Sequence, residues 1–319
     1  MQYTQLGNSD LNVSRICFGC WQLSPAFWGD VPLEPWEQAL NSAVDLGVNF
    51  IDTANAYGNG YAEESLGNYF AKSGTRDKFV LATKFYWIIQ EDGRHPNTTY
   101  DSILEECDKS LKRLQTDRID LYQVHAFDPL TRPDQVAAAL KRLQDEGKVR
   151  YFGVSNLNAE QMRMYAKHID IVSLQPQYSL LNRNVEQGEL PYCLSENIGV
   201  IPYSPLARGI LTGKYARDHK FTDTRKDNPL FSGEAFHRIL DAMDELTPIA
   251  ADLNLTVAQL AIRWNLTHPA ITAPIVGIKS PDHIEGIVAA AEDVLPIELW
   301  HTIAAIVQTA KSEALAMNG

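Results

Sequence analysis

Short apolar runs alternate with amphipathic segments along almost the whole chain. Eight of these runs are rich in β-branched and aromatic residues, and most are continuously apolar rather than alternating. This pattern is typical of parallel strands whose two faces are both covered. The approximate starts of the eight expected strands are Arg15, Val48, Phe79, Ile119, Arg150, Ile171, Gly199 and Ile271.

Between the runs lie segments whose apolar positions recur every three or four residues, which predicts amphipathic helices. Gly47 and Gly147 follow two of these segments, and glycine readily adopts the left-handed backbone that ends many helices. The expected helices span residues 34–46, 62–72, 98–114, 132–146, 158–167, 185–196, 234–252, 256–266, 281–291 and 296–316.

Eight strand–helix units in a chain of 319 residues predict an α/β fold, a single (β/α)8 TIM barrel. We also expect an N-terminal β-hairpin plug over residues 2–14 and additional helices near the C-terminus. A doubly wound open sheet is the competing architecture, but its Gly-x-Gly-x-x-Gly turn is missing from the chain. Because no low-complexity segment or change in composition divides the chain, we expect one domain over residues 1–319.

Composition narrows the classes of partner. The chain has 28 Lys plus Arg against 40 Asp plus Glu, a net charge of −12, which argues against nucleic acid or an anionic membrane as the main partner. An anionic cofactor remains compatible with this charge, because a phosphate site needs only a few local donors.

No membrane span or signal peptide is recognisable in the sequence. Four scattered cysteines do not make a disulfide scaffold, so we expect a cytoplasmic protein. The pair Cys17 and Cys20 is interpreted as small apolar fillers rather than a redox or zinc site.

Polar and ionisable residues stand at the carboxyl ends of the expected strands, where barrel enzymes place their chemistry. One further residue, Tyr57, lies just beyond the second strand. The residues at the strand ends are Asp52, Lys84, His125, Ser155, Asn156, Gln175, Tyr203 and Ser204.

Four of these residues form a chemically coherent set. An ammonium at the end of the apolar strand before Lys84 needs a partner, and Asp52 on the neighbouring strand is the natural one. We expect the Lys84 charge to lower the pKa of the Tyr57 phenol, which would make Tyr57 a general acid. His125 could donate a hydrogen bond to the same substrate oxygen. Such a set suits the reduction of a carbonyl group by a hydride from another molecule.

Other interpretations stay open at this level. Tyr57 alone could pack on the barrel rim, Lys84 could form a Schiff base as in barrel aldolases, and His125 could be structural. A metal-dependent hydrolase is disfavoured, since no carboxylate or histidine cluster with ligand spacing follows the strands. Asp77, Asp128 and the charged residues of 117–120 are interpreted as solvated surface.

The set of four resembles that of the aldo-keto reductases, which are TIM barrels that use NADPH. "GVNFIDTANAYGNGYAEESLG" resembles the family's Asp/Tyr signature, "LATK" its lysine strand and "RIDLYQVHAFD" its histidine strand. "GKVRYFGVSN", "LQPQYSLLNR" and "GVIPYSPLARGILTGKY" resemble its cofactor-binding stretches. The loop over residues 207–233 is more similar to the bacterial stress-protein and channel β-subunit branch than to aldose reductase.

The resemblance implies roles for individual residues. Tyr57 would donate the proton, Lys84 and Asp52 would support it, and His125 would orient the carbonyl. Trp21 would form part of the substrate wall. From their place after strand ends, Trp21, Tyr86 and Trp87 are expected to line a substrate pocket with Tyr57 and His125, although aromatic residues there could equally pack on the rim. The implied cofactor-binding residues are Gly19, Cys20, Trp21, Asp52, Ser155, Asn156, Gln175, Tyr203, Ser204, Leu206, Gly209, Lys214, Gly277, Lys279, Ser280 and His283. Arg217, Lys220, Arg225 and Lys226 are expected to fold over the phosphates.

The stretch after the last strand departs from the family pattern. It reads "IVGIKSPDHIEGI", in which Gly286 and Ile287 replace the usual Glu and Asn near the adenine and His283 takes the Gln/Arg position. Lys279 and Ser280 are still placed to bind a phosphate, so NADPH/NADP+ is the expected cofactor, with NADH as the alternative.

The sequence therefore predicts an NADPH-dependent oxidoreductase, a carbonyl reductase or alcohol dehydrogenase that reduces aldehydes or ketones with a tyrosine proton donor. The rival is a redox-responsive binding protein that holds its nucleotide tightly and turns over little. The expected partner is a small carbonyl substrate, without nucleic acid, membrane or metal, in a monomer or simple homo-oligomer. Substrate choice is expected to lie in the loops over residues 86–97, 127–132 and 216–231.

Overall fold

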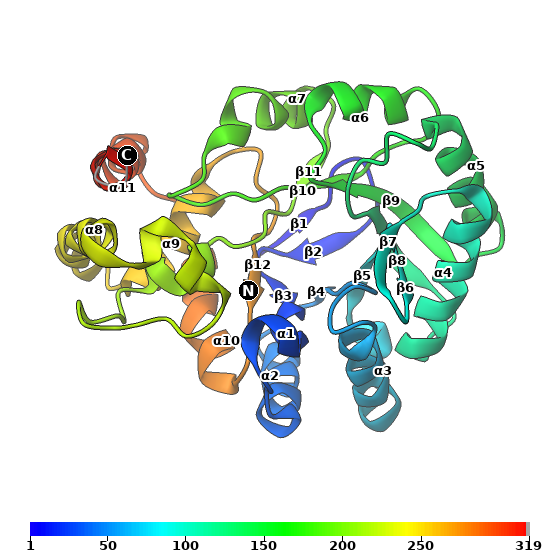
Figure 1. Ribbon diagram of the computed structural model, residues 1–319, viewed down its shortest axis with the longest axis horizontal. Helices are drawn as coiled ribbons and strands as arrows, with labels where there is room; N and C mark the ends of the chain where they lie inside the picture. The colour runs from blue at the N-terminus through cyan, green and yellow to red at the C-terminus, as the bar shows by residue number, and fades with distance from the viewer. Residues whose placement is uncertain (317–319) are drawn as a thin grey trace.

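A parallel eight-stranded barrel forms the centre of the molecule in this computed structural model, which describes residues 1–316 (Figure 1). The ring closes because the backbone N–H of Ile275 donates to the carbonyl of Pro202 at 2.8 Å, beside a parallel bridge between Tyr203 and Ile275. The predicted TIM barrel is thereby confirmed. Its strands are β3 (Cys17–Gly19), β4 (Phe50–Asp52), β5 (Val80–Phe85), β8 (Ile119–Val124), β9 (Val149–Ser155), β10 (Ser173–Gln175), β11 (Gly199–Val200) and β12 (Ile275–Gly277).

Helices surround the strands, as the 3.6-residue periodicity predicts (Figure 1). Gly47 and Gly147 follow α2 and α5 with φ of 78° and 72°, which confirms them as helix terminators. Asn158 and Thr256 begin α6 and α9 with reciprocal capping boxes. The helices are α1 (Pro25–Trp28), α2 (Leu33–Asp45), α3 (Tyr61–Ser73), α4 (Tyr100–Leu114), α5 (Pro133–Asp145), α6 (Ala159–Ala166), α7 (Glu189–Ser195), α8 (Gly233–Asp252), α9 (Val257–Thr267), α10 (Pro281–Val288) and α11 (Ile297–Ala316).

An N-terminal hairpin of β1 (Tyr3–Gln5) and β2 (Asn12–Ser14) plugs one end of the barrel, as predicted. Leu6, Leu11 and Val13 are buried in one apolar cluster with barrel side chains such as Phe50. Burial of these side chains removes apolar surface from water and closes the end where the strands begin. The functional cleft is left to the opposite end.

A second hairpin, absent from the sequence prediction, follows β5. It consists of β6 (Trp87–Gln90) and β7 (Gly93–Pro96), which pair antiparallel with Ile89 opposite Arg94. Its exposed, charged turn resembles an ordinary loop in the sequence, and this explains why the pattern did not reveal it.

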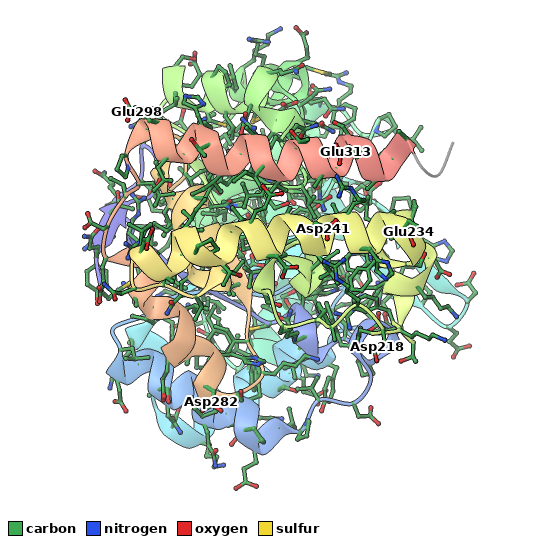
Figure 2. The ribbon with its side chains drawn as sticks, turned by 90° about the vertical axis from the view of Figure 1, so that its left-hand side faces the viewer. Asp218, Glu234, Asp241, Asp282, Glu298 and Glu313 are labelled. Carbon is green, nitrogen blue, oxygen red and sulfur yellow. The ribbon has the colours of Figure 1, made fainter. Side chains whose placement is uncertain are left out.

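Two additional helices, α8 and α11, lie side by side on one flank of the barrel (Figure 2). Arg238 on α8 pairs with Glu313 on α11. Trp264 and Trp300 stack with ring centroids 5.1 Å apart, and each indole N–H donates to the other residue's carbonyl. The expected C-terminal helices are therefore confirmed. No helix within residues 1–316 has the length and apolarity needed to cross a membrane.

Two surface assignments were wrong. Asp120 is 2% exposed and accepts hydrogen bonds from Arg76, Arg150 and the Leu81 backbone N–H. Asp128 is 5% exposed and accepts from Thr98, from the Leu130 backbone N–H and from the Thr131 hydroxyl. Both carboxylates hold loops at the barrel ends, a role that sequence alone does not distinguish from solvation.

The four cysteines are buried and form no disulfide with one another, in agreement with the interpretation of Cys17 and Cys20 as small apolar fillers.

Candidate active site

A cleft of about 1090 Å³ opens at the carboxyl ends of the strands. The Arg208–Arg225 part of the 207–233 loop supplies one wall, and α1 with the segment before it supplies another. TIM barrels place their functional groups at this end because the side chains that follow each strand converge there. The predicted strand-end residues therefore meet in one space.

Lys84 lies beneath the floor of the cleft and is fully buried. Its ammonium donates to Asp52 Oδ1 at 2.6 Å, to the Thr53 carbonyl at 2.8 Å and to the Tyr57 hydroxyl at 3.1 Å. Burial alone would lower the pKa of Lys84, but Asp52 and Tyr57 outweigh it and the net pKa lies above the ordinary value. A lysine that is charged and uses all three N–H groups is a poor Schiff-base nucleophile.

The second oxygen of Asp52 is held from the barrel interior. Gln175 Nε2 donates to Oδ2 at 2.9 Å and Gln123 Nε2 donates to it at 3.2 Å. The carboxylate is thus fixed by the ammonium on β5 and by two amides on β8 and β10. This network sets the position of Lys84 and, through it, of the Tyr57 oxygen.

Tyr57 borders the cleft with its hydroxyl turned toward Lys84. The predicted fall in its pKa was wrong in direction: burial raises the pKa to about 12, although the Lys84 charge opposes the rise. The desolvation of the phenolate is therefore the larger effect. Tyr57 keeps its proton at neutral pH, and its hydroxyl donates to no group of residues 1–316.

His125 faces Tyr57, with the two rings edge to face at 6.2 Å. Burial lowers the pKa of His125 to about 3, with smaller contributions from the charges of Lys84 and Arg94. Its Nδ1 is buried without a hydrogen-bond partner among the described residues. A neutral imidazole has one N–H to donate, which suits it to orient a substrate oxygen.

The amide-rich end of the cleft is a connected network. Asn156, with φ of 59°, donates to the His125 carbonyl at 3.0 Å and accepts from the Tyr203 hydroxyl at 2.9 Å. Ser155 Oγ donates to the Gln175 carbonyl at 2.9 Å. These groups offer the donors and acceptors that a carboxamide requires, beside the aromatic face of Tyr203.

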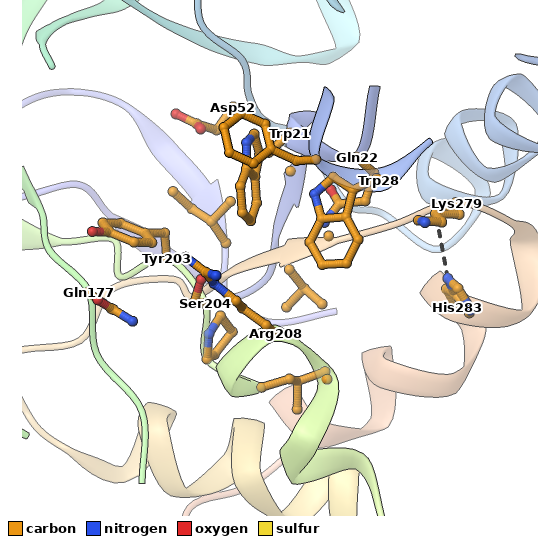
Figure 3. Close-up of a pocket in the computed structure, with 18 of the residues that line it drawn as sticks. Trp21, Gln22, Trp28, Asp52, Gln177, Tyr203, Ser204, Arg208, Lys279 and His283 are labelled. Carbon is orange, nitrogen blue, oxygen red and sulfur yellow. Dashed lines mark hydrogen bonds between the residues drawn. The ribbon is translucent and has the colours of Figure 1, made fainter. Parts of the chain in front are cut away.

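The opposite end of the cleft is basic although the whole chain is acidic (Figure 3). Lys279 Nζ lies 5.0 Å and Arg225 Cζ 5.4 Å from the centre of the Trp28 ring. Burial lowers the pKa of Lys279, and the nearby charges of Arg225 and Lys214 lower it further. Arg225 pairs with Asp223 at 2.6 Å, so Lys279 and Lys214 carry the excess positive charge that favours a polyanion.

Unsatisfied polar atoms in this cleft fit a dinucleotide. Gln22 Oε1 and Trp28 Nε1 are buried without hydrogen-bond partners among residues 1–316, and both side chains line the cleft. The Gln22 side chain occupies the space above Gly277, where a Cβ atom would lie 1.7 Å from it. The cleft thus offers amide groups at one end and basic groups at the other, a combination that fits a nicotinamide and phosphates. No group of three or more His, Cys, Asp or Glu in the described chain is arranged to hold a metal.

Three predicted contacts lie elsewhere. The Cys20 backbone N–H already donates to the Asp52 carbonyl, because β3 and β4 stay paired. Ser280 lies in extended backbone after Lys279 and therefore points away from the cleft. Tyr86, with φ of 144° between β5 and β6, packs on the core, whereas Trp87 lines the cleft. Lys84 lies behind Tyr57 and does not itself line the cleft. The remaining predicted residues line the cleft: Gly19, Trp21, Asp52, Tyr57, Trp87, His125, Ser155, Asn156, Gln175, Tyr203, Ser204, Leu206, Gly209, Lys214, Gly277, Lys279 and His283.

Sequence reasoning missed several lining residues. Arg208 stands within the quoted cofactor stretch, which was the available signal, whereas Gln22 and Arg94 gave none. Of the four basic residues expected over the phosphates, Arg225 lines the cleft. Arg217, Lys220 and Lys226 instead line a separate cavity of about 370 Å³.

Comparison with known proteins places these features in a family. The model of the aldo/keto reductase family matches residues 15–308. Aldo-keto reductase YhdN of Bacillus subtilis is 37% identical over 90% of this chain and 88% of its own length. The solved glycerol dehydrogenase AKR11B4 of Gluconobacter oxydans superposes with a TM-score of 0.89 at 31% identity, covering 97% of this chain and 95% of its own.

Further relatives differ in their cofactors and roles. Aldo-keto reductase yakc [NADP(+)] of Schizosaccharomyces pombe is 35% identical over 88% of this chain and 84% of its own. An NADH-specific methylglyoxal reductase of Escherichia coli is 31% identical, covering 91% and 93%. A probable voltage-gated potassium channel subunit beta of rice is 33% identical, covering 97% of each chain. The relatives include bacterial reductases and channel β-subunits, which confirms the predicted branch. The chain belongs to the aldo/keto reductase family, whose members are oxidoreductases that act on carbonyl compounds.

Proposed function

We propose that this protein is an NADPH-dependent carbonyl reductase in which Tyr57 protonates the substrate oxygen. The observation that carries the proposal is the geometry at Lys84. Its ammonium donates to Asp52, to the Thr53 carbonyl and to the Tyr57 oxygen. Because the phenolic oxygen accepts from Lys84, its own hydrogen is available to a ligand in the cleft.

The chain's residues then divide the chemistry. A reduced nicotinamide, when bound, supplies the hydride that forms the new C–H bond at the carbonyl carbon. As the C=O π electrons move to oxygen, Tyr57 gives that oxygen its proton and the product is an alcohol. Lys84 stabilises the tyrosinate that remains, while the neutral imidazole of His125 orients the oxygen. Preorganisation by the Asp52 network keeps these donors in place.

The cofactor would extend from the amide network to the basic end. Ser155, Asn156 and Gln175 are proposed to hold the carboxamide, with Tyr203 against the ring. Arg208, Lys214 and Arg225 would neutralise the pyrophosphate, and Lys279 the 2′-phosphate. This cluster supports NADPH as the preferred nucleotide. Because relatives named for NADP(+) and for NADH both exist, family membership does not decide the cofactor preference. The proposed preference for NADPH therefore rests on the basic residues of this chain.

The test is a panel of aldehydes and ketones assayed with NADPH and with NADH, expressed as kcat/KM. We expect turnover of reactive aldehydes such as para-nitrobenzaldehyde, with NADPH preferred. Preference for NADH would contradict the role of Lys279, and lack of reduction of any carbonyl compound would contradict the enzyme assignment.

The rival function is a nucleotide-responsive binding protein, favoured by the similarity to the rice channel subunit. The discriminating measurement is the ratio of the nucleotide off-rate to the hydride-transfer rate. For an enzyme we expect release to allow many turnovers. Nucleotide that survives gel filtration, together with negligible turnover, would favour the rival.

A further inference from the structure

The β6–β7 hairpin brings an arginine into the substrate end of the cleft. In its antiparallel register Trp87 pairs with Pro96, Ile88 with His95, and Ile89 with Arg94. Paired residues share a face and alternate along each strand, so Trp87 and Arg94 lie on one face and His95 on the other. Trp87 and Arg94 both line the cleft.

Arg94 has no counter-ion in the described chain. Its side chain is half-buried, and its Nε donates to the neutral Asn59 Oδ1 at 2.8 Å. No carboxylate of residues 1–316 forms an ion pair with it; the nearby Asp92 pairs with His95 instead. A half-buried charge without an opposite charge is unfavourable, and a ligand can supply what the chain does not.

The neighbouring catalytic groups do not cancel this charge. Tyr57 and His125 are neutral near pH 7, and Lys84 is balanced by Asp52. Arg94 is close enough to His125 to contribute to lowering its pKa. The substrate end of the cleft therefore carries about one uncompensated positive charge, close to the carbonyl-orienting histidine.

The phosphate-binding charges are a separate group. Lys279 interacts electrostatically with Arg225, Lys214 and Asp223, on the loop and strand at the other end of the cleft. Arg94 comes from the hairpin after β5 and contributes to the electrostatics of His125 instead. The cofactor phosphates thus account for the Lys279 cluster and leave Arg94 without a role.

We propose that Arg94 binds an anionic group of the substrate, so that the preferred substrates are aldehydes or ketones bearing a carboxylate or a phosphate. The inference rests on the proposed reductase function. A guanidinium offers a planar pair of donors that matches either anion, while Trp87 supplies an apolar wall. The anion would lie on the hairpin side, with the carbonyl oxygen directed at Tyr57 and His125.

The test uses pairs of substrates in which one member carries an anionic group and the other a neutral group at the same position. Para-carboxybenzaldehyde is compared with its methyl ester, and phosphorylated glyceraldehyde with glyceraldehyde, as ratios of kcat/KM with NADPH. We expect the charged member to be preferred in at least one pair, and the pair identifies carboxylate or phosphate. Arg94→Gln should lower that ratio by about 10- to 100-fold, the range for a hydrogen bond to a charged group.

Two further variants separate binding from folding. Asn59→Asp retains Arg94 but gives it an internal carboxylate, so the ratio should fall even where Arg94→Gln is unstable. Arg142→Gln, which removes an exposed arginine paired with Glu146 on α5, should leave the ratio unchanged. Equal kcat/KM within both pairs, or an unchanged ratio in Arg94→Gln and Asn59→Asp, would overturn the inference. Failure to reduce any member would overturn the proposed function, and the inference with it.

Discussion

Lys84 is an ammonium in a place where water cannot solvate it. The chain compensates with Asp52 at 2.6 Å and with two oxygens from the Thr53–Tyr57 segment. Asp52 in turn receives two glutamine amides, so the whole network is satisfied. A buried pair of this kind fixes geometry more than it adds stability, because desolvation offsets most of the attraction.

This pairing predicts a specific pattern of stability changes. Lys84→Met leaves the Asp52 carboxylate buried without its cation and should lower the free energy of unfolding by about 3–5 kcal/mol. The double variant Asp52→Asn with Lys84→Met removes both charges and should recover part of that loss. Urea unfolding of the two single variants and the double variant measures the coupling. Strict additivity would show that the two charges do not interact.

The buried His125 predicts a pH dependence of stability. Its pKa is lowered from 6.5 to about 3 in the folded protein, so between these values the unfolded chain binds a proton that the folded chain does not. Stability attributable to His125 is therefore lost as pH falls below 6.5. From pH 7 to pH 5 the wild type should lose about 2 kcal/mol more than His125→Gln.

The measurement is urea unfolding at both pH values. His301→Gln on the exposed side of α11 serves as the control, because its imidazole lies on the surface. An equal loss in wild type and in His125→Gln would show that the folded imidazole accepts its proton normally.

At the residue scale, sequence placed Asp52, Tyr57, Lys84 and His125 correctly at the carboxyl ends of their strands or just beyond. It failed on the direction of the Tyr57 pKa, because the sign depends on how much desolvation opposes the Lys84 charge. Side-chain direction also escaped it. Tyr86 and Ser280 each stand beside a residue that lines the cleft, and the sequence does not show which of the two neighbours does so.

At the scale of elements, close approach of helices depends on single glycines. A Cβ at Gly67 in α3 would lie 2.1 Å from the Arg113 carbonyl oxygen, which belongs to the backbone of α4. By contrast, nothing lies within 4 Å of a Cβ at Gly286 in α10. Neither position has positive φ, so helix propensity favours alanine equally at both.

Gly67→Ala should therefore destabilise the protein by about 1–3 kcal/mol or more, since backbone atoms must move apart. Gly286→Ala should be neutral or stabilising by up to about 1 kcal/mol. Thermal and urea unfolding of the two variants test the contrast. Equal stability of both variants would mean that α3 and α4 separate without cost.

Elements with strong periodicity were predictable, and short ones were not. The helical pattern over residues 98–114 gave α4 nearly to its observed bounds, Tyr100–Leu114. Each strand of the β6–β7 hairpin has only four residues, and the turn between them is polar. Strands this short have too few positions to produce a recognisable hydrophobic period in the sequence. Arg94 lies in this hairpin, and its place in the cleft could not be predicted for that reason.

Across the whole molecule, the local charge of the cleft is opposite in sign to the net charge of the chain. The chain has a net charge of −12, while Lys214, Arg225 and Lys279 gather at one end of the cleft. The Arg208 side chain lies beside Ser204, nearer the amide network (Figure 3). Acidic side chains such as Asp218, Asp241 and Glu313 lie on an outer flank (Figure 2). A local basic site in an acidic protein directs anions to the cleft. A single domain over residues 1–319 stays a prediction.

Lys279→Ala should weaken NADPH binding by about 10-fold or more, while NADH binding changes by about twofold at most. The reason is that the 2′-phosphate exists only on NADPH. Lys226→Ala, in the same loop region as Arg225 but beside the separate cavity, is the control and should leave both affinities unchanged. Fluorescence titration gives the dissociation constants, and equal weakening for both nucleotides would assign Lys279 to the pyrophosphate instead.

In the proposed mechanism the Tyr57 hydroxyl, held by Lys84, delivers the proton to the carbonyl oxygen. This step can be measured by single-turnover reduction of para-nitrobenzaldehyde with NADPH-loaded protein, comparing wild type with Tyr57→Phe. We predict an unchanged dissociation constant for NADPH and hydride transfer slower by about 100-fold or more. Wild-type transfer by Tyr57→Phe would contradict the account.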